Sequence, residues 1–334
     1  MTLQQGQDAL SLNGVSLSRI GLGSWAMGGG GLFGWGHQDD KDSIDTMHAA
    51  IEAGVNWIDT APVYGRGHSE EVVGRFLQDV PTGDRPMVLT KCGIVWDSAG
   101  STRTLHPDSI RAECDASLQR LGVESLDMLQ FHQPDEVGTP LEDSWATMLQ
   151  LLDEGKIRSA GVSNYEGAAL QTICDQGQLT SVQSPMSLID RDIGSTIVPW
   201  AREHSVGVLV YSPMASGLLT DSFTAERASS FPEDDWRSRN QQFQEPNLSR
   251  NLALRDAVVE VADAHSTKVS AVAVAWTLSW PGVSAAIVGG RRPNQLTDWV
   301  DAVDLDLTDD DLVTIQSALT ESEAGTGPTS PTGA

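Results

Sequence analysis

Four side chains of different chemistry follow apolar runs of the sequence and could together protonate a carbonyl group. They are Asp59, Tyr64, Lys91 and His132. A phenol is a poor acid at neutral pH because its pKa lies near about 10, and a nearby ammonium lowers that pKa by stabilising the phenolate. A carboxylate keeps the ammonium charged, and an imidazole can orient a substrate oxygen toward the phenol. The set predicts a proton donor aimed at a carbonyl.

Each of these residues alone also has an ordinary structural explanation. Asp59 could cap a turn, Lys91 could be a surface charge, and Tyr64 and His132 could be packing residues. All four residues lie at or just after the ends of predicted strands. This common placement favours a catalytic role, because it is hard to assign to chance for four residues of one sheet.

The elements that must position these residues are eight short apolar runs, which alternate with amphipathic stretches. Runs that are apolar on both faces are typical of parallel strands covered by helices. The expected strands are Arg19–Ser24, Trp57–Ala61, Met87–Cys92, Leu126–His132, Ser159–Ser163, Ser181–Met186, Gly207–Tyr211 and Ala285–Val288.

Helical periodicity is expected between the strands. The clearest helix begins with Pro107 and stops at Gly122, the usual asymmetry of helix ends. The expected helices are Asp42–Ala53, Pro107–Leu121, Pro140–Leu152, Glu166–Asp175, Thr196–His204, Leu252–Ala264, Val269–Ser279 and Pro293–Val300. Eight strand–helix repeats predict an α/β fold of the closed (β/α)8 TIM-barrel type rather than an open doubly wound sheet. Active sites of such barrels form at the carboxyl ends of the strands.

Three segments lie outside the repeat. Leu10–Leu17 reads as a β-hairpin that turns at Asn13-Gly14 and could close the barrel bottom. Residues 214–248 form a long polar connection after strand seven, which predicts a functional loop with extra helices at the carboxyl end of the barrel. We expect residues 1–320 to form a single barrel domain and residues 321–334 to be a disordered tail.

Composition excludes several classes of function. The formal net charge is -25, with 30 Asp but 4 Lys, so nucleic acid and anionic lipid would be repelled. This acidity also suggests a salt-tolerant surface, although an ordinary acidic protein is an equal alternative. The three cysteines are far apart, the histidines show no metal spacing, and neither a signal peptide nor a transmembrane run is evident. A cytoplasmic protein without a metal is expected.

The sequence resembles the aldo-keto reductase superfamily over nearly its whole length. The matching pieces are GLGSW at 21–25, AIEAGVNWIDTAPVYGRGHSEEVVG at 50–74, LTKCG at 89–93, LDMLQFHQPD at 126–135, GVSNY at 161–165, VQSPMSL at 182–188, YSPMASGLLT at 211–220 and IVGGRRPNQL at 287–296. The resemblance implies a reaction without a metal, in which hydride passes directly between bound NADPH and a carbonyl carbon.

The resemblance also implies a role for each matching residue. Tyr64 would be the general acid/base, Lys91 the group that modifies its pKa, Asp59 the partner of Lys91, and His132 the substrate-orienting group. The nicotinamide carboxamide would lie against Ser163, Asn164 and Gln183, with Tyr211 stacked on the ring. The remaining cofactor contacts implied are Ser24, Ser212, Met214, Ser216, Leu218, Gly289, Arg291 and Gln295.

One departure from the family pattern concerns the adenine end of the cofactor. Trp299 stands where the family often has Asn, and it could stack on the adenine or pack on the barrel. Arg291, with Arg292 and Gln295, would contact the 2′-phosphate, and Pro293 predicts a helix N-terminus whose amides could face it. Two adjacent arginines in so acidic a chain favour NADP, with NAD as the alternative.

Substrate contacts are harder to predict. Gly29-Gly30-Gly31-Leu32-Phe33-Gly34 fits a dinucleotide-binding pattern formally, but it does not open a helix and reads as part of a substrate loop. Trp25 and Trp96 are the predicted substrate residues, with Phe33 and Trp35 as further wall residues. Each of these aromatics could equally pack its own loop.

The leading prediction is an NADP-dependent oxidoreductase acting on a small aldehyde, ketone or sugar. One alternative is a subunit that senses redox state by binding NADP with low turnover. Another is a Schiff-base aldolase that uses Lys91, although the cofactor motifs count against it. The sequence leaves the substrate, the physiological direction and the oligomeric state open.

Overall fold

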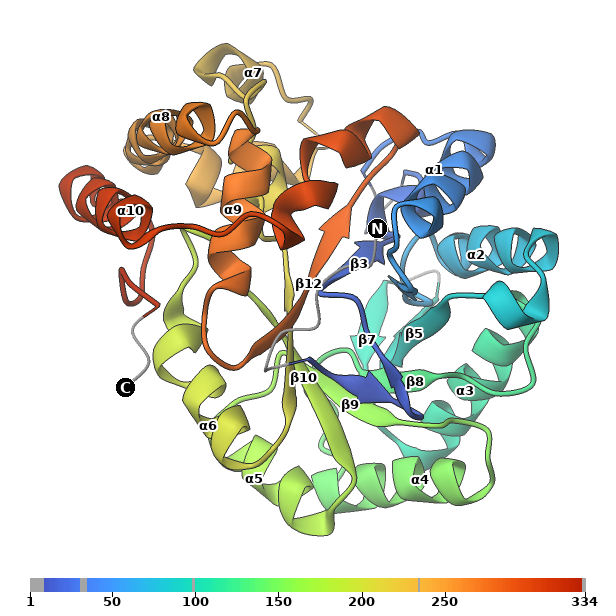
Figure 1. Ribbon diagram of the computed structural model, residues 1–334. Coiled ribbons are helices and arrows are strands. Elements are labelled where there is room, and N and C mark those ends of the chain that lie inside the picture. Colours follow the sequence, from blue (N-terminus) through green and yellow to red (C-terminus); the bar gives the residue numbers. More distant parts are fainter. Residues whose placement is uncertain (1–8, 31–34, 98–99, 234, 332–334) are drawn as a thin grey trace.

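The computed structural model describes residues 9–30, 35–97, 100–233 and 235–331. Eight parallel strands form a closed barrel with the helices outside it (Figure 1). The strands are β3 (Ile20–Gly23), β4 (Trp57–Asp59), β5 (Met87–Cys92), β8 (Met128–Phe131), β9 (Ala160–Ser163), β10 (Leu179–Pro185), β11 (Gly207–Tyr211) and β12 (Val283–Gly289). The predicted (β/α)8 barrel and its eight strands are confirmed.

Alternation along each strand separates the barrel interior from the outer layer. Trp57, Leu89 and Met128 belong to an interior apolar cluster near the start of their strands. Two positions further along each strand, on the same side, come Asp59, Lys91 and Gln130. The interior is therefore apolar at its base and polar toward the carboxyl ends, which is where chemistry is expected.

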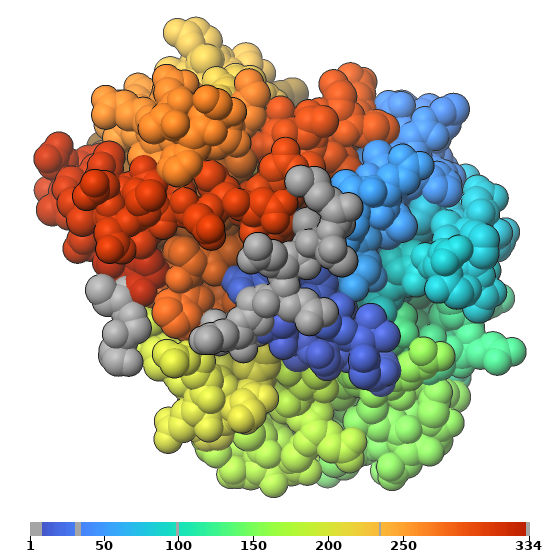
Figure 2. All heavy atoms as spheres, in the orientation of Figure 1, coloured from blue at the N-terminus to red at the C-terminus, as the bar shows by residue number. Residues whose placement is uncertain are grey.

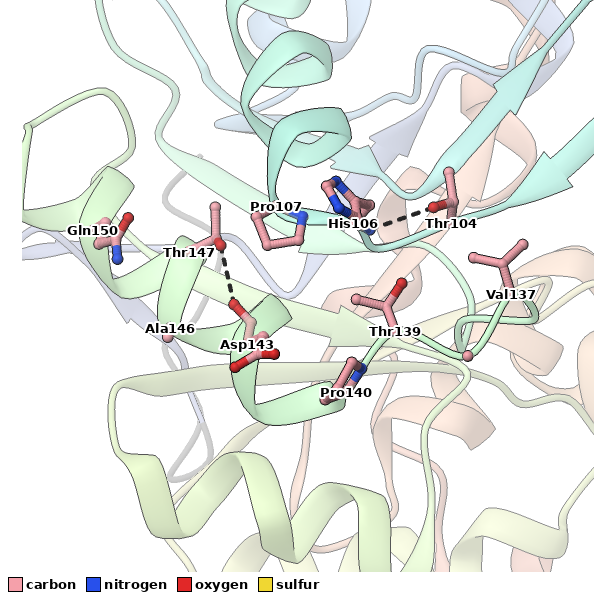
Figure 3. A pocket seen from close by; sticks show the side chains of 11 residues that line it. Thr104, His106, Pro107, Val137, Thr139, Pro140, Asp143, Ala146, Thr147 and Gln150 are labelled. Atoms are coloured by element: carbon pink, nitrogen blue, oxygen red, sulfur yellow. Dashed lines mark hydrogen bonds between the residues drawn. The ribbon is translucent and has the colours of Figure 1, made fainter.

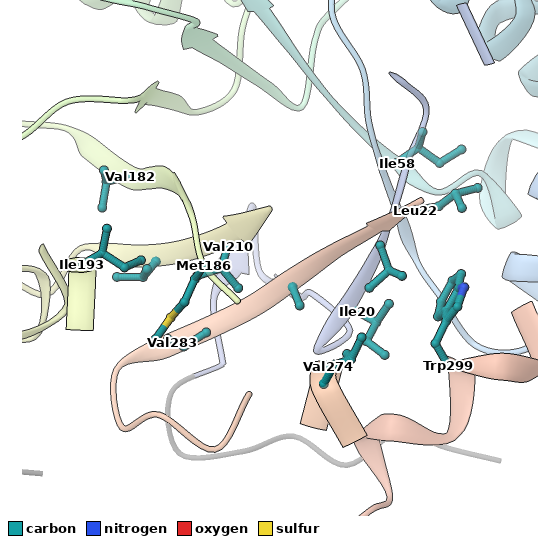
Figure 4. Packing of buried hydrophobic residues seen from close by; sticks show 14 of the residues in the cluster. Ile20, Leu22, Ile58, Val182, Met186, Ile193, Val210, Val274, Val283 and Trp299 are labelled. Carbon is teal, nitrogen blue, oxygen red and sulfur yellow. The ribbon is translucent and has the colours of Figure 1, made fainter. Parts of the chain in front are cut away.

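The intervening residues face outward, into the layer between strands and helices. Ile20 and Leu22 of β3, together with Val274 of α9, are fully buried in this layer (Figure 4). Burial of such side chains on both faces of every strand is the main reason that the sheet closes and remains covered.

The helices of the described chain include seven of the eight predicted ones, in the predicted order, and three more. They are α1 (Asp40–Glu52), α2 (His68–Asp79), α3 (Pro107–Leu121), α4 (Leu141–Asp153), α5 (Gly167–Gln176), α6 (Ile197–Glu203), α7 (Ala225–Ser229), α8 (Asn247–Ala264), α9 (Val269–Leu278) and α10 (Asp309–Ser322). Helix α2 was not predicted. It begins after Gly67, which has a left-handed φ of 97° and no side chain that could cap the helix, so the usual start signal is missing.

The helix predicted at Pro293–Val300 is wrong in type. Two short 3₁₀ turns, η7 (Pro293–Asp298) and η8 (Val300–Val303), replace it. Trp299 interrupts them because its φ of -148° and ψ of -11° lie outside the helical region. Its buried indole fixes this backbone in place of a continuous helix.

The N-terminal hairpin is present as predicted. Strands β1 (Ser11–Leu12) and β2 (Val15–Ser16) pair antiparallel around Asn13 and Gly14. Leu12 and Leu17 join the interior apolar cluster, so the hairpin closes the base of the barrel. Figure 2 shows this end of the chain, in dark blue, near the middle of the visible face.

The long connection after β11 carries short helices, as predicted. Besides α7 it contains the 3₁₀ turns η4 (Ala215–Gly217), η5 (Trp236–Arg239) and η6 (Gln241–Phe243). A second hairpin, β6 (Ile94–Trp96) and β7 (Ser101–Arg103), follows β5 and was not predicted. Its strands are only three residues long, too short for a pattern of alternation to be visible.

The prediction of a disordered tail over 321–334 is wrong for its described part. Helix α10 continues to Ser322, and the residues after it pack beside the segment that follows β10. The guanidinium of Arg191 is buried there and donates to the carbonyls of Ala324, Gly327 and Pro328. A polar, glycine-rich sequence is ordered by a cation that lies more than a hundred residues away. Residues 332–334 lie outside the described part.

In the part of the chain that the structure describes, no helix combines the length and apolar character needed to cross a membrane.

Candidate active site

The carboxyl ends of β4 and β5 bring a buried ion pair into the barrel. The Lys91 ammonium donates to Asp59 Oδ1 at 2.5 Å and to the carbonyl of Thr60 at 3.1 Å. Both side chains are nearly inaccessible to solvent. The two side chains meet because β4 and β5 are hydrogen-bonded neighbours, in a register that pairs Asp59 with Leu89, two positions before Lys91.

Tyr64 and His132 complete the group above this pair. The phenol oxygen of Tyr64 lies 3.4 Å from Lys91 Nζ, and the ring of His132 stands edge-on to the tyrosine ring with centroids 5.8 Å apart. The four side chains predicted from the sequence are therefore adjacent, and they come from three neighbouring strand ends.

The protonation states of these groups follow from their burial. Burial, together with the negative charge of Asp59, raises the pKa of Tyr64 well above its ordinary value. Burial and the charge of Lys91 lower the pKa of His132 well below its ordinary value. The site therefore presents a protonated phenol and a neutral imidazole at neutral pH.

These directions bear on one expectation, the effect of Lys91 on the pKa of Tyr64. The sequence predicted that Lys91 would lower the pKa of Tyr64, but the phenol in this structure has a raised pKa. The reason is that Asp59 contacts the ammonium directly and offsets its charge, while burial favours the neutral phenol. Burial also lowers the pKa of Lys91 itself, against the opposing effect of Asp59.

A network of small hydroxyl groups braces Asp59 from behind. Ser24 donates its backbone N–H and its hydroxyl to the Asp59 carbonyl, and its hydroxyl contacts that of Ser69 at 2.8 Å. Ser69 also contacts the hydroxyl of Thr60. Ser24 is fully buried and its side chain supports strand β4, so its contact with a cofactor stays a prediction.

Two glycines let the loop that carries Trp25 pack directly on the backbone of Tyr64. A Cβ on Gly28 would lie 2.7 Å from the Tyr64 carbonyl carbon, and a Cβ on Gly65 would lie 2.0 Å from the Gly28 oxygen. Gly65 also has a left-handed φ of 62°. This backbone contact places the 3₁₀ turn η1 (Trp25–Gly28) beside the phenol.

A buried carboxylate that the sequence analysis missed lies behind Lys91. Glu70, in the first turn of α2, is fully buried and accepts from Thr90 Oγ1 at 2.5 Å and from Arg120 Nε at 2.6 Å. It therefore links α2 and α3 to the strand residue that precedes Lys91. In the sequence, Glu70 is marked only by its place in the family-like segment 50–74, and that segment does not reveal which residues Glu70 contacts.

Polar side chains beyond the ion pair form a second cluster. Asn164 donates to the His132 carbonyl at 3.0 Å and accepts from the Tyr211 hydroxyl at 2.8 Å. Gln183 donates to Asp59 Oδ2 at 2.9 Å, which ties this cluster to the ion pair. Asn164 also donates to Ser163 Oγ at 3.1 Å. The predicted carboxamide-binding residues are thus neighbours of one another and of the tetrad.

The segment after β11 turns sharply at the residues predicted to contact the cofactor. Ser212 and Ser216 both have left-handed φ values, 58° and 57°. They are half-buried, as is Met214. Leu218 is different because its side chain is fully buried in the core, so any contact with a cofactor would come from its backbone. Gly289 ends β12 beside Gly23 of β3 and is exposed.

The predicted phosphate contact at Arg291 has a different local arrangement. Arg291 donates from Nε to Gln38 Oε1 at 2.8 Å and from Nη2 to the His37 carbonyl. Gln295 Oε1 accepts the backbone N–H groups of both Arg291 and Arg292. The backbone amides predicted to face a phosphate are therefore already used, because Gln295 folds back to cap its own turn.

The predicted aromatic contacts divide into two groups. Trp299 is buried on the barrel, where it lies near Gly290, and this matches the packing alternative. Trp25 and Trp96 instead pack around Tyr64, at a ring-centroid distance of 6.3 Å for Trp25 and in the apolar cluster of Ala61 and Ile94 for Trp96. Phe33 lies outside the described residues.

A large surface groove lies apart from these residues. It has a volume of about 800 Å³ and is lined by the segments that lead into α3 and α4 and by residues of α4 as far as Gln150 (Figure 3). None of its lining residues belongs to the tetrad. Within the described ranges, no cluster of three or more His, Cys, Asp or Glu side chains has the arrangement of a metal site.

Comparison with known proteins agrees with the geometry. A model of the aldo/keto reductase family matches residues 19–320. The aldo-keto reductase YhdN of Bacillus subtilis is 36% identical over 85% of this chain and 84% of its own length. An NADH-specific methylglyoxal reductase of Escherichia coli is 33% identical over 90% of this chain and 94% of its own length.

A solved structure extends the similarity to three dimensions. The glycerol dehydrogenase of Gluconobacter oxydans is 37% identical, with a TM-score of 0.86 over 98% of this chain and 99% of its own. An aldo/keto reductase of Klebsiella pneumoniae, solved with NADP and acetate, is 25% identical, with a TM-score of 0.71 over 93% of this chain and 95% of its own. The chain therefore belongs to the aldo/keto reductase family of oxidoreductases, which act on carbonyl and CH–OH groups.

Proposed function

We propose that the protein is an NADP-dependent oxidoreductase that transfers hydride between nicotinamide and a small carbonyl or alcohol substrate. The observation that carries the proposal is the contact series from Asp59 through Lys91 to Tyr64, with His132 beside the phenol. Such a series places one transferable proton at the carboxyl end of the barrel.

Each member of the tetrad has a proposed role in reduction. Tyr64 donates its proton to the substrate oxygen, because its raised pKa keeps it protonated at neutral pH. Lys91 stabilises the phenolate that forms, and Asp59 keeps Lys91 charged and fixed in position. His132, neutral because burial lowers its pKa, can share a hydrogen bond with the same oxygen.

The residues of the second cluster fit a nicotinamide. Tyr211 presents a half-buried ring whose hydroxyl is fixed by Asn164, so its face is available for stacking. Asn164, Ser163 and Gln183 surround that position with amide and hydroxyl groups, which match a carboxamide that both donates and accepts. NADPH supplies the hydride when it is bound. The chain's own residues position the ring and the proton.

Arg291 remains the proposed ligand of the 2′-phosphate, in a revised form. Its guanidinium already tethers the connection between β3 and α1 through Gln38 and His37, so a phosphate would add to an existing cluster. Arg292 faces Asp42 at 3.4 Å, and this carboxylate counts against a second phosphate contact there. The K. pneumoniae relative was solved with NADP, whereas the E. coli relative is NADH-specific, so NAD is the alternative.

The named relatives suggest small, polar substrates. One is a glycerol dehydrogenase and another a methylglyoxal reductase, and both names refer to three-carbon compounds. We propose that the protein acts on substrates of this size in the cytoplasm, in the direction of either reduction or oxidation. A Schiff-base aldolase is disfavoured because Lys91 is buried in an ion pair and its lone pair is not available.

The test is a rate measurement with two cofactors. Oxidation of NADPH and of NADH should be followed with methylglyoxal, glyceraldehyde and dihydroxyacetone, and the reverse reaction with glycerol. We expect turnover that falls by orders of magnitude when Tyr64 is replaced by Phe. Tight NADPH binding without turnover on any of these compounds would instead support the redox-sensing alternative.

A further inference from the structure

The connection between β11 and α8 places a tryptophan, Trp236, against the aromatic residue that lies beside the phenol of Tyr64. Trp236, in η5, stacks on Trp25 with ring centroids 5.9 Å apart and an interplanar angle of 28°. Trp25 in turn lies 6.3 Å from the ring of Tyr64. The sequence analysis assigned no role to Trp236.

A third indole closes this arrangement. Trp35 meets Trp25 edge-on at 5.3 Å and Trp236 edge-on at 5.9 Å. Trp25, Trp35 and Trp236 are each half-buried and form what we call the aromatic wall. Offset-stacked and edge-on contacts of this kind stabilise an ordered cluster beyond the burial of its surface.

Arg237 fixes the wall from its outer side. The guanidinium lies over the ring of Trp35 at 4.6 Å and over the ring of Phe231 at 4.3 Å. Asp235 accepts from its Nη2 at 2.6 Å and from its Nε at 3.1 Å. Because Arg237 follows Trp236 directly, a guanidinium fixed between two rings also fixes the indole of Trp236 against Trp25.

The wall limits the space beside Tyr64. His132 stands on one side of the phenol, Trp96 packs against the same apolar cluster as Tyr64, and Trp25 backed by Trp236 covers a further side. Indole faces favour C–H groups, and the nearby cation is already paired with Asp235. An uncharged, narrow carbonyl compound fits these surroundings better than a bulky or an anionic one.

We propose that Trp236 is a specificity-determining residue and Arg237 its positioning residue, which together select small, uncharged aliphatic carbonyl and hydroxycarbonyl substrates. This inference rests on the proposed function and names the substrate class of the same site. Trp236 acts through Trp25, on whose ring it stacks beside the phenol of Tyr64, and Arg237 acts through Trp35 and Trp236.

The experiment compares one small and one bulky aldehyde, glyceraldehyde and 2-naphthaldehyde, in the wild-type protein and five variants. Trp236→Ala should lower kcat/KM for glyceraldehyde about tenfold, mainly through KM, because Trp25 loses the ring that holds it beside the phenol and packs less closely on the substrate. The rate with 2-naphthaldehyde should be unchanged or higher, so the ratio of the two kcat/KM values shifts at least about tenfold. Trp236→Phe should restore part of the selectivity.

The arginine variants separate positioning from a structural role. Arg237→Ala should shift the same ratio in the same direction, and Arg237→Lys should restore part of it because an ammonium still attracts an aromatic face. The matched control is Arg239→Ala, on the same turn, whose guanidinium donates to the Glu233 carbonyl and touches no ring of the wall. Melting temperatures of all variants would identify any that fail to fold.

Three results would overturn the inference. One is a kcat/KM ratio within twofold of wild type in both Trp236→Ala and Arg237→Ala. Another is a rise confined to the KM for NADPH in Arg237→Ala, which would make Arg237 a cofactor ligand. A wild-type protein without turnover on any carbonyl compound would remove the proposed function and this inference together, whereas a turnover with unchanged selectivity would remove this inference alone.

Discussion

The carboxyl group of Glu113 should make the stability of the protein depend on pH near neutrality. Glu113, on α3, accepts the backbone N–H of Gly93 at 2.9 Å and the hydroxyl of Ser109 at 3.1 Å. Gly93 lies between the end of β5, which carries Lys91, and the hairpin of β6 and β7. Burial raises the pKa of Glu113 from 4.5 to about 7, against the lowering effect of these hydrogen bonds and of Arg120.

The direction of the effect follows from the raised pKa. In the unfolded chain the carboxyl loses its proton near pH 4.5, while in the folded chain it keeps the proton to about pH 7. The free energy of unfolding is therefore highest below the pKa of the unfolded chain. It falls as the pH rises through the pKa of the folded chain. A tenfold difference in dissociation constant is worth about 1.4 kcal/mol, so full ionisation costs the folded state about 3 kcal/mol. Between pH 5.5 and 8.5 the change should be about 2 kcal/mol.

Glu113→Gln removes the titrating group while keeping a carbonyl oxygen that can accept from Gly93. Urea unfolding, followed by tryptophan fluorescence at pH 5.5 and 8.5, gives the free energy of unfolding of both proteins. The variant should gain about 2 kcal/mol relative to wild type between these pH values. Glu321→Gln, at an exposed position of α10, is the matched control and should show no such gain. A difference between Glu113→Gln and wild type that is the same at both pH values would refute the reasoning.

Three further predictions concern the site and the surface. Tyr64→Phe should lower turnover by roughly 10²–10⁴-fold, while NADPH affinity measured by fluorescence titration stays near wild type; near-normal turnover would remove Tyr64 as the proton donor. Arg291→Ala should weaken NADPH binding about ten- to hundredfold, because a guanidinium–phosphate contact is worth about 1.5–3 kcal/mol. NADH binding should change little, and an equal loss for both cofactors would assign Arg291 to tethering His37 and Gln38. The melting temperature should rise from dilute buffer to molar NaCl or KCl, because the net charge is -25 and salt shortens the Debye length from about 30 Å to about 3 Å. A flat melting temperature would show that the acidic surface is merely solvated.

The sequence by itself determined the barrel and the location of its chemistry. Apolar runs such as Met87–Cys92 alternate with helical stretches. Eight parallel strands joined by helices with right-handed connections close into a (β/α)8 barrel. Because the strands are parallel, every residue at a strand end is delivered to the same edge. Asp59, Lys91 and His132 could therefore be expected near one another before any contact was known.

Local signals failed where the deciding contact is distant along the chain. Helix α2 begins after Gly67 without a polar cap, and its start is fixed instead by packing on α3, where a Cβ on Gly67 would meet Arg120. The residues after Ser322 look disordered in composition, yet they are ordered by Arg191. In both cases the folded conformation of the segment is stabilised by a distant partner, which the sequence of the segment itself does not reveal.

The tertiary structure alone decided the electrostatics of the site. Residue types suggested that Lys91 would lower the pKa of Tyr64, but the outcome depends on how closely Asp59 approaches the ammonium and how deeply the phenol is buried. The aromatic wall is a similar case, because Trp25 and Trp236 are separated by more than two hundred residues. Their stacking arises only when the loops after β3 and β11 meet at the carboxyl end of the barrel. Side-chain distances and burial are properties of the folded chain, so residue order fixes which groups are present but not how their charges and surfaces act on one another.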